Sequence, residues 1–194
     1  METAAPARTR AGHIPGEAGL WVLILGDLLA FSLFFAVFLV HRAHNVALFA
    51  ASQATMGRGF GLANTALLLA SSLFVAWAVV AARAGAPARS ARLIILALSC
   101  GCGFIGSKVL EWGGKIAAGI TLNTNEFYGF YYMFTGIHLL HVLLGMGVLV
   151  YLLARSNRAD RGASYVAVME GGGVFWHLVD LLWVVLFALF YLLR

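Results

Sequence analysis

Five long apolar segments dominate the chain and limit what it can fold into. They cover residues 18–40, 60–82, 92–112, 127–154 and 171–193. Each has the roughly 20 residues that a helix needs to cross the hydrocarbon core of a bilayer. A helix also satisfies its backbone hydrogen bonds within one segment, as that core requires. Only 11% of the 194 residues are charged, against about 25% in soluble domains. The sequence predicts an all-α fold, an integral membrane bundle of five transmembrane helices.

The residues between these segments predict how the chain lies in the membrane. We expect residues 1–17 to form a polar N-terminal tail and residues 18–194 to form a single transmembrane domain. Cytoplasmic loops carry an excess of Lys and Arg, so counting these residues on each side indicates the orientation. Eight lie on the side of the N-terminus and five on the opposite side. This favours a cytoplasmic N-terminus and an outward C-terminus. The basic residues are scattered, so nothing indicates a nucleic-acid partner.

Five polar or charged residues fall inside the predicted spans: Asp27, His138, His141, His177 and Asp180. Such groups are costly in lipid, so each needs a reason to be there. At 1.5 Å per residue, Asp27, His138 and Asp180 lie about 14 Å from the inner face, and His141 and His177 about 9 Å. The two histidines of the fourth span share a helix face, as do His177 and Asp180. We therefore expect one polar seam among the first, fourth and fifth spans.

This seam has two readings. His141 and His177, on different helices at similar depth, could ligate a haem b, which would make the chain an electron-transfer protein by itself. However, only three of the six histidines lie inside spans, and a metal site usually needs three or more converging ligands. Hydrogen bonding between helices is the alternative, with no metal and no catalytic residue. Asp27 could likewise lock helix contacts or pass protons.

Charged and capping residues near the outer ends of the third and fourth spans carry further predictions. Lys108, Glu111 and Lys115 are spaced i, i+3 and i+7, which indicates an ion cluster at the membrane interface. Glu126 precedes the fourth span, where a negative charge favours the helix dipole. Residues 123–125 can cap that helix through Asn or Thr side chains.

Five motifs in order resemble subunit III of the haem-copper oxidases, the cytochrome c oxidase subunit III family. They are GLWVLILGDLLAFSLFF (19–35), NTALLLASS (64–72), KVLEW (108–112), FYGFYYMFTGIHLLHVLLG (127–145) and FWHLVDLLWVVLF (175–187). Within the family, HIPGEAGLW (13–21) and LFAASQATMGRGFG (48–61) are most similar to the NorE-type proteins encoded with nitric oxide reductases.

The resemblance implies a non-catalytic accessory subunit of a haem-copper respiratory oxidase or nitric oxide reductase. Such a subunit binds no metal, packs against the haem-copper catalytic subunit, and supports its stability, assembly or proton access. Bound phospholipid is the one ligand that the resemblance allows. It places the protein in a bacterial inner membrane, with a cytoplasmic N-terminus and a periplasmic C-terminus. Histidines at the positions of His138, His141 and His177 serve helix contacts in the family.

Two departures from the family pattern stand out. The full-length family has seven helices with a lipid-filled cleft between the first two and the rest, and this chain has only the last five. The family usually has Glu in the first of these shared helices, where this chain has Asp27. The shorter Asp side chain weakens any proton-relay role carried over from the family.

Overall fold

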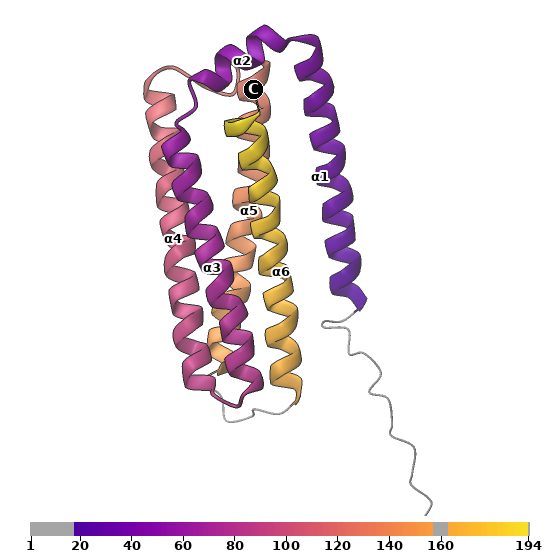
Figure 1. Ribbon diagram of the computed structural model, residues 1–194, viewed down its shortest axis with the longest axis vertical. Helices are drawn as coiled ribbons and strands as arrows, with labels where there is room; N and C mark the ends of the chain where they lie inside the picture. The colour runs from indigo at the N-terminus through magenta and orange to yellow at the C-terminus, as the bar shows by residue number, and fades with distance from the viewer. Residues whose placement is uncertain (1–17, 157–162, 194) are drawn as a thin grey trace, which may run out of the picture.

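The computed structural model describes residues 18–156 and 163–193, and five long helices run the length of this part of the chain (Figure 1). They are α1 (Ala18–His44), α3 (Arg58–Arg83), α4 (Pro87–Ala117), α5 (Glu126–Ser156) and α6 (Ala163–Phe187). Each is long and apolar enough to cross a membrane. The prediction of an all-α bundle with five transmembrane helices is confirmed. The predicted tail at residues 1–17 lies outside the described residues.

Two shorter elements were not predicted. Helix α2 (Val46–Ala54) lies across one end of the bundle (Figure 1), and we refer to this end as the α2 end. Its Phe49 is fully buried, with its ring 5.4 Å from that of Phe38 and 5.8 Å from that of Phe127. At the same end, the π-helical turn η1 (Ala188–Leu192) extends α6 and buries Phe190 and Tyr191. Both elements close the bundle where the predicted spans stop.

The connection between α4 and α5 is fixed by one turn residue and one cap. Gly119 has φ +77°, a left-handed conformation that glycine adopts without a steric penalty and that often follows a helix. The side chain of Asn125 accepts a hydrogen bond from the backbone N–H of Tyr128 at 3.0 Å, which confirms the predicted capping by one of residues 123–125. Its amide also donates to Ser52 Oγ at 3.0 Å. The start of α5 is therefore tied to α2.

Close helix contacts depend on glycine at two positions. A Cβ built on Gly145 of α5 would lie 2.7 Å from the ring of Trp176 on α6. A Cβ on Gly61 of α3 would lie 2.8 Å from the rings of Phe187 and Tyr191. No real Cβ tolerates such distances, so these glycines let α3 and α5 approach α6 closely. The result is a compact packing of α6 between them.

Helix α1 lies at the edge of the bundle (Figure 1) and is held mainly by aromatic contacts near the α2 end. Phe38 contacts Phe130 at 5.7 Å and Phe190 at 5.2 Å between ring centroids, and Phe34 stacks on Phe134 at 5.7 Å. Most of α1 is open: only 17% of its apolar window is buried, against 61% for α6. One flank of α1 therefore faces lipid or a partner.

Candidate functional site

A buried network of charged and polar residues is centred on Lys108 and Glu111 of α4. Lys108 Nζ donates to Glu111 Oε2 at 2.7 Å, to Tyr131 Oη at 3.3 Å and to Tyr191 Oη at 3.2 Å. The hydroxyl of Tyr191 donates in turn to the second oxygen, Glu111 Oε1, at 2.5 Å. Three helical elements, α4, α5 and η1, thus share one hydrogen-bonded network. We call these four residues the buried ion network.

Aromatic rings complete the surroundings of both lysines. Lys108 Nζ lies 4.9 Å from the ring centroid of Trp183, and Lys115 Nζ lies 5.7 Å from that of Tyr131, distances at which a cation is attracted to a ring. Lys108 is 1% exposed, Glu111 4% and Lys115 9%. The predicted pairing within the cluster is therefore present near the end of α4, and the structure adds that its residues are buried in the bundle. The three residues are enclosed by the bundle because distant aromatic residues give them partners there.

A second polar contact joins α1 to α5. His141 Nδ1 lies 2.9 Å from the carbonyl oxygen of Ile137, to which it donates, and His141 Nε2 lies 3.5 Å from Asp27 Oδ2. Because Nδ1 donates to the carbonyl, Nε2 is the ring nitrogen that faces the carboxyl. The His141 side chain is 15% exposed and that of Asp27 24%. This pair therefore lies inside a span but on the open flank of α1.

The third polar contact is between α3 and α6. His177 Nδ1 is hydrogen-bonded to Ser72 Oγ at 2.5 Å. Asp180, one turn further along α6, is 7% exposed, and its Oδ1 has no partner within the described residues. The single seam predicted among the first, fourth and fifth spans is therefore wrong. His177 contacts a serine of the second span, α3, while the partner of Asp27 within the described residues is His141.

His138 does not join either pair. Its ring is fully buried, 5.3 Å from that of Trp183 and 5.7 Å from that of Phe104, and neither ring nitrogen has a partner in the part of the chain that the structure describes. His141 and His177, the two residues considered as haem ligands, are each engaged with a different neighbour, Asp27 and Ser72. Over residues 18–156 and 163–193, no three His, Cys, Asp or Glu residues are grouped for metal binding.

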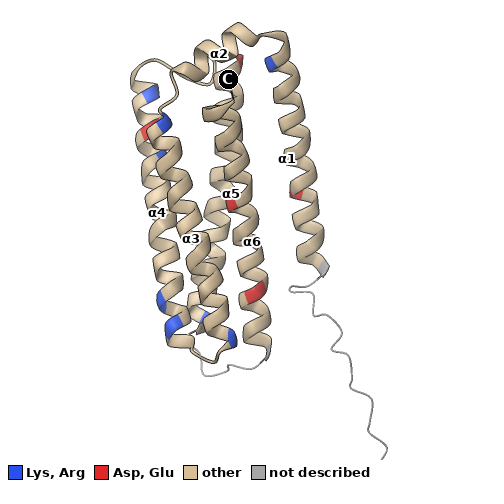
Figure 2. Cartoon of the chain, viewed as in Figure 1, with Lys and Arg blue, Asp and Glu red and all other residues tan. Residues whose placement is uncertain are grey.

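Besides Tyr131 and Tyr191, several site residues along the α3–α6 interface were not predicted. Arg83 Nε donates to Glu170 Oε1 at 2.8 Å, far from the α2 end, and Trp183 Nε1 donates to Thr65 Oγ1 at 3.1 Å. Together with Ser72 and His177, these contacts make a series of polar links along the α3–α6 interface. Figure 2 shows charged residues near both ends of the bundle and acidic positions part-way along α1 and on α6. Of these residues, Glu170 could have been noticed in the sequence, because it is an acidic residue directly before the predicted span 171–193.

Comparison with known proteins identifies the family. The family model for cytochrome c oxidase subunit III matches residues 16–194. The chain is 27% identical to cytochrome bo(3) ubiquinol oxidase subunit 3 of Pseudomonas aeruginosa, covering 90% of this chain and 83% of the relative. It is 24% identical to cytochrome c oxidase subunit 3 of Corynebacterium diphtheriae, covering 100% and 96%.

A third relative is a longer protein. The chain is 27% identical to heme-copper oxidase subunit I+III of Aeropyrum pernix, covering 91% of this chain but only 22% of that protein. With the family model matching nearly the whole chain, this protein belongs to the cytochrome c oxidase subunit III family.

Proposed function

We propose that this subunit III family member is a non-catalytic accessory subunit that packs against the haem-copper catalytic subunit of a respiratory oxidase or nitric oxide reductase. Its relatives are named as third subunits of oxidases, and the relative from Aeropyrum pernix carries subunits I and III in one chain. A chain that joins the two subunits holds them together permanently. This arrangement supports a direct contact between the equivalent separate subunits.

The observation that carries the proposal is the polar pair on the open flank of α1. Asp27 and His141 are 24% and 15% exposed inside spans, where polar groups facing lipid are costly. Lys108 and Glu111, in contrast, are only 1% and 4% exposed, because neighbouring helices cover them. A partner subunit against this flank would remove Asp27 and His141 from lipid and give α1 the packing that it lacks. We therefore infer that the catalytic subunit docks along α1.

The same pair supports a role in proton access. A histidine beside a carboxyl inside a span is the kind of residue pair found in proton relays of membrane proteins. No chain of polar groups links this pair to both membrane faces within the described residues. The proposal is accordingly local proton exchange with the partner and not pumping by this chain. Asp27 replaces the longer Glu that the family usually has there.

The finer assignment is the nitric-oxide-reductase-associated, NorE-type branch, in a denitrifying bacterium. The segments 13–21 and 48–61 support it. We further propose an inner-membrane location with a cytoplasmic N-terminus and a periplasmic C-terminus, supported by the excess of Lys and Arg on the N-terminal side. In this orientation the α2 end lies at the periplasmic surface. The chain itself would hold no haem or metal, with phospholipid as its only bound molecule.

A pull-down from native membranes in mild detergent, with an optical spectrum of the product, tests the proposal. Co-purification of a haem-copper catalytic subunit that accounts for all haem absorbance is the expected result, and its identity distinguishes an oxidase from a nitric oxide reductase. Replacement of His141 and His177 by Ala should lower bundle stability and leave the absorbance unchanged. A lone protein with stoichiometric haem, lost in these variants, would instead establish the electron-transfer alternative.

A further inference from the structure

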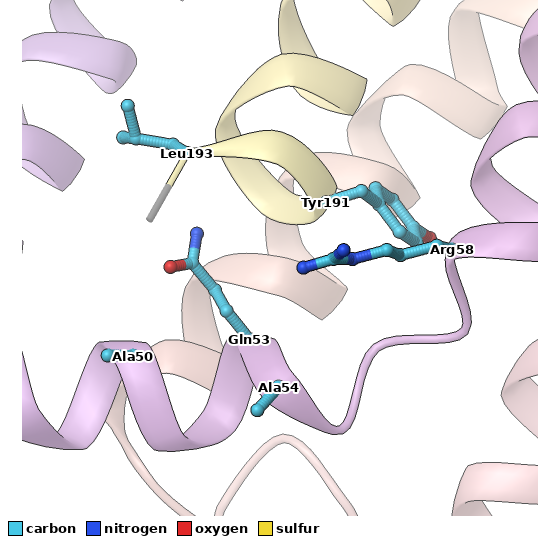
Figure 3. A pocket seen from close by; sticks show the side chains of 6 residues that line it. All are labelled: Ala50, Gln53, Ala54, Arg58, Tyr191 and Leu193. Atoms are coloured by element: carbon cyan, nitrogen blue, oxygen red, sulfur yellow. The ribbon is translucent and has the colours of Figure 1, made fainter.

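A cavity of about 320 Å³ lies at the α2 end, between α2, the start of α3 and the end of the chain's last helical turn. Its lining residues are shown in Figure 3: Ala50, Gln53, Ala54, Arg58, Tyr191 and Leu193. The guanidinium of Arg58 extends beside the Tyr191 ring and points toward the amide of Gln53 across the cavity (Figure 3). The remaining walls are apolar. None of these residues belongs to the polar pair on α1.

Two polar groups of this cavity have no partner among the described residues. Arg58 makes no side-chain hydrogen bond or ion pair with any other described residue. The side chain of Gln53 is 7% exposed, and its Nε2 donates to the carbonyl oxygen of Leu189 at 2.7 Å, which leaves Oε1 as the acceptor facing away from that bond. Within the described chain, Gln53 Oε1 is buried without a donor. Unpaired buried acceptors are rare because they cost stability. The cavity therefore presents a free cation and a free acceptor together.

The charges around the cavity do not balance. Tyr191, which lines the cavity, bonds both Lys108 and Glu111, so the buried ion network directly adjoins the cavity wall. Among the described residues that line the cavity, Arg58 is the charged one. Glu126, another acidic residue at this end, is already engaged by His41 and by Asn45. The cavity wall consequently has an excess of positive charge, which an anion would neutralise.

The start of α3 adds to this preference. Arg58 is its first residue, and the N-cap residue Gly57 provides no side-chain hydrogen bond. The free N–H groups of a helix N-terminus attract anions. A hydroxyl group next to the anion would in addition supply the donor that Gln53 Oε1 lacks. The site thus fits a ligand that combines a phosphate with a neighbouring hydroxyl.

We propose that this cavity binds the headgroup of an anionic phospholipid of the phosphatidylglycerol class. The phosphodiester accepts hydrogen bonds from the Arg58 guanidinium, and a glycerol hydroxyl donates to Gln53 Oε1. The apolar walls formed by Ala50, Ala54 and Leu193 favour a lipid over free phosphate, because they can contact the start of an acyl chain. Helix α2 crosses the end of the spans, at the level where headgroups lie. This site is independent of the proposed catalytic partner.

Native mass spectrometry of the full-length protein in mild detergent tests the site. Phosphatidylglycerol and phosphatidylcholine with identical acyl chains are added separately, and inorganic phosphate is added in a third arm with thermal stability as its readout. We expect preferential retention of phosphatidylglycerol. Loss of a charged hydrogen bond to phosphate should weaken retention about tenfold or more in Arg58→Gln. Arg89→Gln, an exposed arginine at the opposite end, is the matched control and should retain phosphatidylglycerol as the wild type does.

A second variant keeps the test decisive if Arg58→Gln does not fold. Ala54 is exposed on α2 and lines the cavity, so Ala54→Phe should block the cavity without removing any charge, and it should also reduce retention. Equal retention of the two lipids by the wild type would overturn the proposal, as would unchanged phosphatidylglycerol retention in both variants. Stabilisation by inorganic phosphate equal to that by phosphatidylglycerol would refute the lipid assignment.

Discussion

The buried ion network allows a quantitative test of how this bundle tolerates charge. In Glu111→Leu, the Lys108 ammonium keeps two tyrosine hydroxyls, at 3.2 and 3.3 Å, but loses the carboxylate at 2.7 Å. In Lys108→Met, the Glu111 carboxylate keeps only the Tyr191 hydroxyl. Each change leaves one charge at 1–4% exposure without its counter-ion, which costs about 3–5 kcal/mol of the free energy of unfolding.

The double variant Lys108→Met/Glu111→Leu should cost much less than the sum of the two. With both charges gone, the remaining loss is that of hydrogen bonds to the tyrosine hydroxyls, about 1–3 kcal/mol for each hydroxyl left without a partner. Replacing a buried ion pair by apolar residues of similar size is often close to neutral. We therefore expect a coupling energy of about 3 kcal/mol or more between the two positions.

Equilibrium unfolding by SDS in mixed micelles measures these free energies. The exposed contact between His41 and Glu126 provides the control cycle, and its coupling should stay below about 1 kcal/mol because it is a surface pair. Additive effects of Lys108→Met and Glu111→Leu, with coupling no larger than in the control cycle, would refute the argument. Such a result would mean that water reaches the two charges in the folded protein.

Three further predictions concern single contacts. Gly145→Ala should destabilise the bundle by about 1–3 kcal/mol, because the new methyl group meets the Trp176 ring. If the variant unfolds in SDS at the same midpoint as the wild type, α5 and α6 can move apart without a loss of stability. Ser72→Ala should cost about 1–3 kcal/mol by removing the partner of His177 Nδ1, and Ser71→Ala, whose hydroxyl donates to a backbone carbonyl, serves as its neighbour control in the same titration. Asp27→Asn should insert normally and change the turnover of the co-purified partner enzyme, and equal turnover at every pH would leave Asp27 a packing residue.

The sequence was sufficient for the five spans because the bilayer itself sets their length. A helix of some twenty apolar residues has no alternative place in a protein of this composition, so segments such as 127–154 could be assigned without tertiary information. Helix α2 could not be assigned in this way. It is nine residues long, too short to span, and its folding depends on Phe49 reaching an aromatic cluster built from α1, α5 and η1.

The polar contacts were predicted less well, since their partners are far apart in the sequence. The i, i+3 spacing of Lys108 and Glu111 correctly indicated that they pair, but their burial depends on Tyr131 and Tyr191, 23 and 83 residues from Lys108. Likewise, His177 is 105 residues from Ser72. The depths predicted from the sequence put Asp27 within one helical turn of His141. Depth does not show which neighbour a side chain faces, so it could not reveal that His177 contacts α3.

A shared helix face also proved too coarse a guide. Three residues turn a helix by about 300°, so His138 and His141 point about 60° apart. In this bundle that angle separates two environments: His141 reaches Asp27 on the flank of α1, whereas His138 packs against Phe104 and Trp183 in the interior. A prediction of shared function from i, i+3 spacing requires that one neighbour covers both positions.

The two kinds of polar contact indicate how the protein combines stability with assembly. Among α3, α4, α5 and α6, polar groups such as Lys108 and Glu111 find their partners within the chain. The Asp27–His141 pair is different, because its own helices leave it partly exposed. A polar pair exposed to lipid lowers stability, so we expect another protein to cover it. Because its ion network is paired within the chain while the α1 flank keeps a polar pair partly exposed, we expect the bundle to be completed by a partner along α1.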